Sequence, residues 1–546
     1  MIVEQDRAFL LHDYLHRSAE RLPEKVALVH QGARLTYAEI EARSNALAHA
    51  LVRRGVQRGD RVLVFAHNSV EAVVSFWAIL KANAVASLVS PLTKGAKLAY
   101  LLNDCRASAL ITDGQLTPVF AAAAATSPHL RAILVSGELD ARLLEGLTGV
   151  ASFGAALEGE RRAGPPPRRS IDVDLAAIVY TSGSTGEPKG VMLTHGNMLA
   201  ASTSITAYLE NVEDDVILCA LPLAFDYGLY QMIMAFRVGA RLVLERSFAY
   251  PAQVLNLMVE EAVTGFPGVP TVFATLAEKM KRNAYAEARP GPPEATPEAA
   301  GSAKAARKAL EFDMIRYVTN TAAALPVKHI LTLKDLFPKA KIFSMYGLTE
   351  CKRCTYLPPE DLDQKPASVG VAIPNTELWI VGENDARLGP GEVGQLVIRG
   401  ATVMRGYWEK PEATAMRLRP GPLPGEVVLY TGDLCKLDDE GYLYFVARMD
   451  DVIKSRGEKV APREVEDAIY EMPGVREAAV VGVPDPILGA AVKAFVVVDP
   501  ACMYAEGDII AHCRARLEPF MVPKHVELCE ALPKTDTGKI KKSGLR

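Results

Sequence analysis

Short apolar runs of strand length alternate with segments of helical periodicity through much of the chain. A strand followed by a helix and then by another strand forms a βαβ unit, and successive units place their strands parallel in a sheet covered by helices. The alternation therefore predicts an α/β fold with a parallel sheet. The strand-like runs are 61–67, 86–90, 109–113, 175–180, 241–245 and 341–345, and the helical segments are 69–84, with Ser69 as its N-cap, and 97–105.

The pattern changes after about residue 376, where short strands follow one another with glycine, proline and aspartate turns between them. This texture predicts a β subdomain. After Arg448 a helix, two strands and a second helix indicate a small α+β domain. We therefore predict a large N-terminal domain of several subdomains over residues 1–448 and a small C-terminal domain over 449–546. Residues 283–309 are rich in Ala, Pro and Glu without an apolar stripe, so we expect a mobile surface insertion there.

Composition excludes several classes of protein. The chain has 546 residues, of which 49% are apolar and 23% are charged, with a net charge of −4. The balanced charge and an aromatic content of 7% give no signature of nucleic-acid binding. The eight cysteines form no dense framework, and Cys351 and Cys354 have no second pair with which to hold zinc, so we expect free thiols in a reducing cytoplasm. The N-terminus does not resemble a signal peptide, and no apolar stretch of about 18 residues predicts a membrane span.

The segment most informative about chemistry is YTSGSTGEPKG, residues 180–190, which lies between a predicted strand and a helix-like run. Its glycines allow a tight turn that exposes backbone N–H groups, and its hydroxyls and one ammonium add further donors. A dense set of donors suits a polyphosphate. The segment is not a Walker A loop, because no Gly-Lys-Ser/Thr sequence closes it. The candidate phosphate-binding residues are Thr181, Ser182, Gly183, Ser184, Thr185, Gly186 and Lys189.

This segment resembles the phosphate loop of the adenylate-forming (AMP-binding) superfamily, which includes acyl-CoA synthetases, aryl-CoA ligases and free-standing adenylation enzymes. The resemblance extends over nearly the whole chain and implies an AMP-forming acid–thiol ligase. Such an enzyme activates a carboxylic acid with ATP as an acyl adenylate, releases pyrophosphate, and then forms a thioester with release of AMP. The further motifs, in the superfamily's order, are LPLAFDYGL (221–229), YGLTE (346–350), GYW (406–408), YTGD (430–433), RMDDVIK (448–454) and PKTDTGK (533–539).

The resemblance also implies residues that hold ATP. Thr349 matches the α-phosphate contact. Glu350 matches the ligand of Mg²⁺, a metal that neutralises the departing pyrophosphate. The residues implied at the nucleoside are Tyr346, with Gly347 beside it, on adenine, and Asp433 and Arg448 on the ribose hydroxyls.

Lys539 resembles the catalytic lysine that the superfamily carries on its mobile C-terminal domain. A lysine suits this role because it is a compact charge on a long flexible stem, and it would bridge the carboxylate oxygen and the α-phosphate. Asp450 matches the family's hinge. Rotation there would withdraw Lys539 and bring the loop from Lys454 to Gly457 to the site, where Gly457 would let the chain pass close to a pantetheine arm.

Phe225 and Asp226 are the candidate substrate residues. Many fatty-acyl and aryl ligases carry histidine at the position of Phe225, whereas Phe-Asp resembles amino-acid-activating domains, in which the aspartate holds the substrate ammonium. A buried carboxylate must be paired or neutralised. Either a substrate nitrogen reaches Asp226, or a nearby base, Lys352 or Arg353, pairs with it. We expect a small carboxylic acid as substrate, and an amino group on it remains open.

The acceptor thiol also has two possible sources. No carrier domain follows Lys539 in this sequence, so CoA is the expected acceptor. The alternative is a free-standing enzyme that adenylates an amino acid or aminoaryl acid and loads the phosphopantetheine of a separate carrier protein. A phosphotransferase would use a similar loop but would release ADP, and Lys539 together with the absence of a Walker A loop opposes it.

Overall fold

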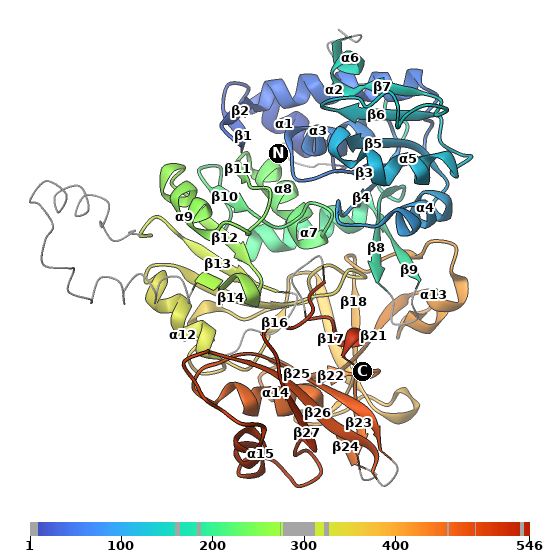
Figure 1. Ribbon diagram of the computed structural model, residues 1–546. Coiled ribbons are helices and arrows are strands. Elements are labelled where there is room, and N and C mark those ends of the chain that lie inside the picture. The colour runs from blue at the N-terminus through green and yellow to red at the C-terminus, as the bar shows by residue number, and fades with distance from the viewer. Residues whose placement is uncertain are drawn as a thin grey trace, which may run out of the picture.

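The computed structural model describes residues 9–158, 164–182, 187–273, 275–276, 312–321, 327–455, 458–485, 488–535 and 540–545. They form a large N-terminal body and a smaller C-terminal body, the red end of the chain in Figure 1. This architecture confirms the predicted α/β fold with a small second domain. The helices are α1 (Asp13–Arg21), α2 (Tyr37–Arg53), α3 (Val70–Lys81), α4 (Gly95–Asp104), α5 (Thr117–Ala125), α6 (Phe153–Glu158), α7 (His195–Tyr208), α8 (Asp226–Val238), α9 (Pro251–Glu260), α12 (Val327–Leu336), α13 (Pro411–Arg417), α14 (Pro462–Tyr470) and α15 (Glu506–Arg514).

Two large sheets organise the N-terminal body. Their strand orders over the described residues are β16-β15-β14-β13-β12-β10-β11-β1-β2 and β19-β9-β8-β4-β3-β5-β6-β7. Pairing is parallel from β14 to β1 and from β8 to β7, as the strand–helix alternation predicted. It is antiparallel at both ends of the first sheet and at the β9 and β19 end of the second. The strands are β1 (Val26–His30), β2 (Ala33–Thr36), β3 (Arg61–Phe65), β4 (Val85–Val89), β5 (Ala107–Asp113), β6 (Ala132–Ser136), β7 (Val150–Ser152), β8 (Leu175–Ser182), β9 (Pro188–Thr194), β10 (Val216–Cys219), β11 (Arg241–Leu244), β12 (Gly265–Gly268), β13 (Tyr317–Asn320), β14 (Lys341–Tyr346), β15 (Thr355–Tyr356), β16 (Val371–Ala372) and β19 (Gly406–Tyr407).

Helix α3 illustrates how the sequence builds this body. Ser69 caps the helix by accepting a hydrogen bond of 3.1 Å from the backbone N–H of Ala72, as predicted. From Ala72 to Leu80 the helix is apolar except for Ser75, a pattern typical of a buried helix. Every residue from Ala72 to Lys81 is buried, and the Trp77 ring lies 5.3 Å from that of Phe236 on α8. The helix therefore belongs to the interior.

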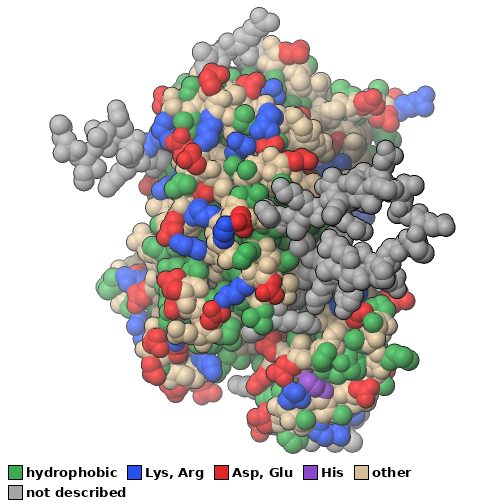
Figure 2. Space-filling view, turned by 90° about the vertical axis from the view of Figure 1, so that its left-hand side faces the viewer, with side chains coloured by type: hydrophobic (Ala, Val, Ile, Leu, Met, Phe, Trp, Pro, Cys, Tyr) green, Lys and Arg blue, Asp and Glu red, His purple; other side chains and the backbone are tan. Residues whose placement is uncertain are grey.

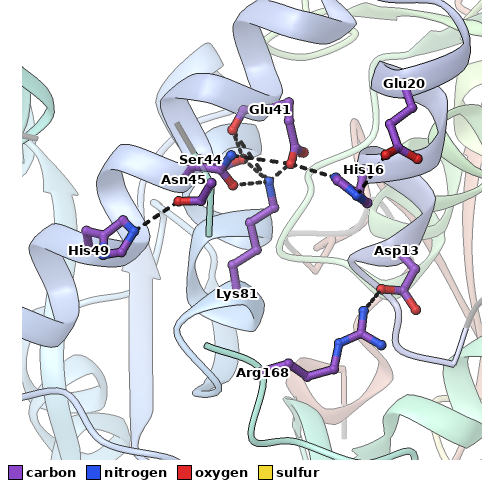
Figure 3. A network of polar contacts seen from close by, with 10 residues as sticks. Asp13, His16, Glu20, Glu41, Ser44, Asn45, His49, Lys81 and Arg168 are labelled. Carbon is purple, nitrogen blue, oxygen red and sulfur yellow. Dashed lines mark hydrogen bonds and ion pairs between the residues drawn. The ribbon is translucent and has the colours of Figure 1, made fainter. Parts of the chain in front are cut away.

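A polar network closes the C-terminal end of α3 (Figure 3). The Lys81 ammonium donates to Oε2 of Glu41 (2.5 Å), Oγ of Ser44 (2.7 Å) and Oδ1 of Asn45 (2.8 Å), all on α2. These three acceptors use all three N–H groups of the ammonium, which is the condition for burying it. Burial nevertheless lowers the pKa of Lys81 to about 8, and the charge of Glu41 offsets only part of that effect. The network fixes α2 against α3.

A third sheet forms the predicted β subdomain. Its order over the described residues is β17-β18-β21-β20, with β22 paired to β21. All of its pairs are antiparallel, and Asp433 on β21 lies opposite Arg448 on β22. Two predicted nucleoside residues are thereby brought face to face. The strands are β17 (Thr376–Val381), β18 (Gly394–Gly400), β20 (Leu418–Pro420), β21 (Val427–Leu437) and β22 (Leu443–Arg448).

The fourth sheet belongs to the C-terminal body and has its own core. Its order over the described residues is β24-β23-β26-β25, with β27 parallel to β26. Val465 and Ile469 of α14 pack in one buried cluster with Val480 and Val496 of the sheet. A separate core is the condition for a separate domain. The strands are β23 (Ile453–Ser455), β24 (Glu458–Val460), β25 (Val475–Asp485), β26 (Gly489–Val498) and β27 (His525–Leu528).

The surface carries both signs of charge. Acidic and basic side chains are interspersed over the face drawn in Figure 2. Among the described residues, no helix is both long enough and apolar enough to cross a bilayer. The insertion predicted over 283–309 lies outside the described residues.

Candidate active site

The β8–β9 hairpin carries the predicted phosphate-binding residues. Thr181 lies opposite Lys189 in its register, and Ser182 lies opposite Pro188. The Lys189 ammonium lies 5.6 Å from the centre of the Tyr407 ring, within the range of a cation–π contact. Of the predicted loop, Gly183, Ser184, Thr185 and Gly186 lie outside the described residues.

Tyr407 connects this hairpin to Glu350. Strand β19 pairs with β9 so that Tyr407 lies opposite Val191, and the Tyr407 phenol donates a hydrogen bond of 2.6 Å to Oε1 of Glu350. Burial, followed by the negative charge of Glu350, raises the pKa of Tyr407 and keeps the phenol a donor. The backbone N–H of Met404 donates to the carbonyl of Glu350 at 2.7 Å. The predicted metal ligand is therefore held by both its side chain and its backbone.

A tight turn from Tyr346 to Cys354 positions Thr349 and Glu350. It is closed by the Cys354 N–H, which donates to the Tyr346 carbonyl at 3.0 Å. Gly347 is required here, because a Cβ at that position would lie 2.1 Å from the carbonyl oxygen of Lys352. The two predicted reaction residues are thus presented by a turn with no room for a side chain at Gly347.

Tyr346, Asp433 and Arg448 form the predicted nucleoside site. The Tyr346 phenol donates to Oδ2 of Asp433 at 2.5 Å, and the Arg448 Nε lies 3.8 Å from Oδ1. Burial raises the pKa of Asp433, and these two neighbours offset only part of that shift. Gly432 has φ +74°, and a Cβ there would lie 1.8 Å from the Arg417 guanidinium. The turn at Gly432 therefore needs a glycine.

Phe225 and Asp226 begin helix α8. Phe225 is the half-buried N-cap residue, and Asp226 is the first residue of the helix and is buried. Oδ2 of Asp226 lies 3.5 Å from Nζ of Lys352, and both side chains are at most 10% exposed. Of the two ways of meeting the Asp226 charge, the structure therefore contains the internal one, an ion pair with Lys352.

The remaining predicted residues belong to the C-terminal part. Lys454 is exposed on β23, and in the described part of the chain no hydrogen bond or ion pair joins it to the residues above. Nε of Arg448 lies 3.9 Å from Oδ1 of Asp450, the predicted hinge residue. Gly457 and Lys539 lie outside the described residues.

Tyr407 lies in the GYW motif and was not predicted as a site residue from the sequence. The signal was the phenol within that motif, because a buried tyrosine hydroxyl needs a hydrogen-bond partner. The buried sulfurs of Cys351 and Cys354 lie 2.8 Å apart. Within the described ranges, no group of three or more His, Cys, Asp or Glu side chains is arranged to hold a metal by itself.

Comparisons with known proteins show the family of the chain. The family model of the AMP-binding enzyme matches residues 15–408, and that of the AMP-binding enzyme C-terminal domain matches residues 464–539. A long-chain-fatty-acid–CoA ligase of Bacillus subtilis is 32% identical over 97% of this chain and 93% of its own length. A feruloyl-CoA synthase of an Amycolatopsis species is 32% identical over 97% of both chains.

Solved structures show the same fold. ATP-bound MatB from Rhodopseudomonas palustris superposes with a TM-score of 0.82 at 29% identity, covering 98% of both chains. The anthranilate CoA ligase AuaEII, in complex with anthranoyl-AMP, has a TM-score of 0.83 at 27% identity, covering 98% of this chain and 96% of that one. With family models that together span most of the sequence, the chain belongs to the AMP-binding enzyme family.

Proposed function

We propose that the chain is an AMP-forming acid–CoA ligase that activates a small carboxylic acid and transfers its acyl group to CoA. In the first half-reaction a carboxylate oxygen attacks the α-phosphorus of ATP and pyrophosphate leaves. In the second, the thiol of CoA attacks the acyl carbon, gives up its proton, and AMP leaves. The relatives support this reaction class, since those named above include acid–CoA ligases for fatty, ferulic and anthranilic acids.

The observation that carries the proposal is the line of contacts from Lys189 through Tyr407 to Glu350. These contacts connect a hairpin whose donors suit phosphate binding with a carboxylate that suits cation binding. Adenylation brings an anionic carboxylate to an anionic triphosphate, so the site must supply positive charge where the two meet. Lys189 supplies one such charge, and Thr349, next to Glu350, supplies a hydroxyl donor for the α-phosphate.

Mg²⁺ is part of the proposal, with Glu350 as its protein ligand. The ion prefers oxygen ligands and is commonly held by one or two carboxylates together with substrate phosphates. Oε1 of Glu350 accepts the Tyr407 hydrogen bond, and a carboxylate has about four lone-pair sites, so acceptor capacity remains for a metal. When bound, the ion neutralises charge on the departing pyrophosphate.

The nucleoside half of ATP would use the second group of residues. Asp433 would accept the two ribose hydroxyls, Arg448 would add a ribose contact, and Tyr346 would pack on adenine. The hydrogen bond from Tyr346 and the nearby Arg448 charge support this assignment, because they orient the carboxylate and stabilise its charged form.

The C-terminal domain would supply the mobile groups. We assign it to residues 449–546 with the hinge near Asp450, and we assign Lys539 to adenylation and the Lys454–Gly457 loop to the thioester step. The separate core of the fourth sheet supports a domain that moves as a unit. CoA is proposed as the acceptor in preference to a carrier protein. A cytoplasmic location fits the eight free cysteines.

Pyrophosphate exchange tests this function. Purified protein with ATP and Mg²⁺ is offered aliphatic, aromatic, dicarboxylic and amino acids one at a time. We expect exchange that depends on the acid, and, after CoA is added, equimolar AMP and acyl-CoA detected by mass spectrometry. Release of ADP, or no acid-dependent exchange with any acid, would contradict the proposal. If the thioester forms only on a carrier protein and not on CoA, the acceptor is the carrier protein.

A further inference from the structure

Arg353 is a buried cation in the same turn as Glu350. The residue is 2% exposed and is among the largest fully buried side chains of the described chain. Its Nε has no hydrogen-bond partner. Among the described residues, no carboxylate lies within ion-pair distance of its guanidinium. A buried charge is retained only when it is paired, so the site lacks an anion.

The neighbours of Arg353 attract the guanidinium without neutralising it. The guanidinium carbon lies 4.5 Å from the centre of the Tyr227 ring, which gives a cation–π contact. The Tyr227 hydroxyl is held by Oγ1 of Thr319 at 2.6 Å, so this ring is fixed in place. Burial raises the pKa of the Tyr208 phenol by more than the charge of the guanidinium lowers it, so this phenol stays neutral. The positive charge is oriented but not compensated.

The adjacent Lys352 does not supply a negative charge for Arg353. Lys352 pairs with Asp226 at 3.5 Å and lies 4.2 Å from the centre of the Tyr230 ring. Tyr227 and Tyr230 are three residues apart on α8 and therefore share one face of the helix. Two cations and one carboxylate thus pack against this face, with one positive charge in excess.

The excess charge lies next to the proposed reaction residues. Thr349 and Glu350 precede Arg353 in a turn closed by the Cys354 N–H and the Tyr346 carbonyl. Arg353 stacks on Tyr227, the residue that follows Asp226 on α8. In the proposed site, an acid whose reacting carboxylate is at Thr349 would extend a second group toward the Arg353 guanidinium.

We propose that Arg353 binds a second carboxylate of the substrate and that the enzyme activates a dicarboxylic acid. This inference rests on the proposed function, and it names the substrate class for that site. A guanidinium matches a carboxylate with two parallel N–H···O bonds, and the unpartnered Nε supplies one of those donors. One carboxylate is adenylated, while the other stays ionised against Arg353. A monocarboxylic acid would leave the buried charge unpaired.

Matched acids test the proposal in the whole enzyme. Butanoate, hexanoate and octanoate are compared with the dicarboxylic acids of the same chain lengths and with the monomethyl esters of those diacids. We expect one diacid to exceed both its monoacid and its monomethyl ester by about 100-fold or more in kcat/KM for AMP formation. Arg353→Met should bring that ratio close to one by lowering the rate with the diacid alone. Arg353→Lys keeps the charge without the two-bond fork and should retain part of the preference.

Arg237 offers a matched control. Its guanidinium lies 5.1 Å from the centre of the Tyr14 ring and donates to the Tyr14 hydroxyl at 2.6 Å. Arg237→Met therefore removes an arginine stacked on tyrosine elsewhere and should leave the diacid-to-monoacid ratio unchanged. If the melting curve shows that Arg353→Met does not fold, two other results test the proposal. They are the diacid-to-monoacid ratio of the wild type and its expected partial loss in Arg353→Lys.

Two failures are distinguishable. A wild-type enzyme that adenylates monoacids as well as diacids overturns this inference and leaves the ligase function standing. An unchanged diacid preference in folded Arg353→Met also overturns it. A wild-type enzyme that forms AMP with an aromatic or amino acid but with no dicarboxylic acid overturns this inference alone, and one that forms AMP with none of the acids in either set overturns the proposed function itself.

Discussion

Tyr407 and Glu350 are 57 positions apart in the sequence, and the phenol of one donates a hydrogen bond of 2.6 Å to the carboxylate of the other. The pairing of β19 with β9 places Tyr407 opposite Val191, on the second strand of the hairpin that carries the predicted phosphate-binding residues. Groups that orient a metal-binding carboxylate set its affinity for the metal. The bond therefore gives Tyr407 a positioning role, with Glu350 as the group that would bind the metal.

Tyr407→Phe should weaken the enzyme through Mg²⁺. Loss of a group that orients a metal ligand lowers metal affinity or activity by about 10- to 100-fold. We expect the Mg²⁺ concentration needed for half-maximal pyrophosphate exchange to rise within that range. Tyr442→Phe is the matched control, because it removes a phenol–carboxylate bond of 2.5 Å to Asp361. Equal Mg²⁺ requirements in both variants and wild type would remove Tyr407 from the metal site.

Asp433→Asn should lose nucleotide affinity at neutral pH. The ionised carboxylate accepts ribose hydroxyls in the proposed site, and hydrogen bonds to a charged group contribute about 1.5–3 kcal/mol, or roughly 10- to 150-fold in Kd. Because burial raises the pKa of Asp433, wild-type affinity for AMP should fall as the pH is lowered towards that raised value. Calorimetric titration with AMP across this pH range should show the affinity of the wild type falling. Asp433→Asn should bind AMP weakly, and its affinity should lack the pH dependence that Asp433 contributes.

The pH dependence of folding stability at Asp433 should be opposite to that of AMP affinity. A carboxyl with a raised folded-state pKa binds more protons when folded, so its contribution to stability falls as pH rises from the unfolded to the folded pKa. At pH 7 the Asp433→Asn protein should therefore melt at the same temperature as wild type or higher. A lower melting temperature would mean that the charged form of Asp433 stabilises the fold.

Lys81 should make stability rise with pH on the alkaline side. Its folded pKa is about 8, against 10.5 without the protein environment, so the unfolded chain binds more protons between those values. The free energy of unfolding should increase across this window in urea titrations, and the increase should be absent in Lys81→Met. At pH 7 that variant should also lose about 3 kcal/mol, because Glu41 is left without its ammonium partner (Figure 3). Adding Glu41→Gln should recover part of the loss, and a flat wild-type profile would contradict the prediction.

Lys539→Ala should separate the two half-reactions. A charge that stabilises the adenylation transition state contributes about 3–4 kcal/mol, so acid-dependent pyrophosphate exchange should fall by 10²–10³-fold. Thioester formation from supplied acyl-AMP and CoA should be largely retained. Lys541→Ala is the control, since Lys541 is exposed two positions further on. Equal loss in both half-reactions would exclude the two-conformation mechanism.

Local signals determined most of the elements. The apolar run at 61–67 became β3, and Ser69 began α3, because strand length, helical spacing and capping are each settled within a few residues. Strand β21 begins at Val427. It runs to Leu437, because Gly432 at φ +74° lets the chain continue through the TGD motif as strand. The motifs also supplied the residues of the proposed nucleoside site, Tyr346, Asp433 and Arg448.

Only the tertiary structure decided which side chains meet. Asp226 pairs with Lys352, Tyr407 with Glu350, and Arg353 stacks on Tyr227, all across long stretches of chain. The sequence left Lys352 and Arg353 as equal candidates for Asp226, because adjacent residues in a turn point in directions set by backbone geometry. Lys352 adopts φ +65° in the turn that Gly347 permits. Packing of that turn against α8 places Lys352 beside the carboxylate of Asp226 and places Arg353 on the ring of Tyr227.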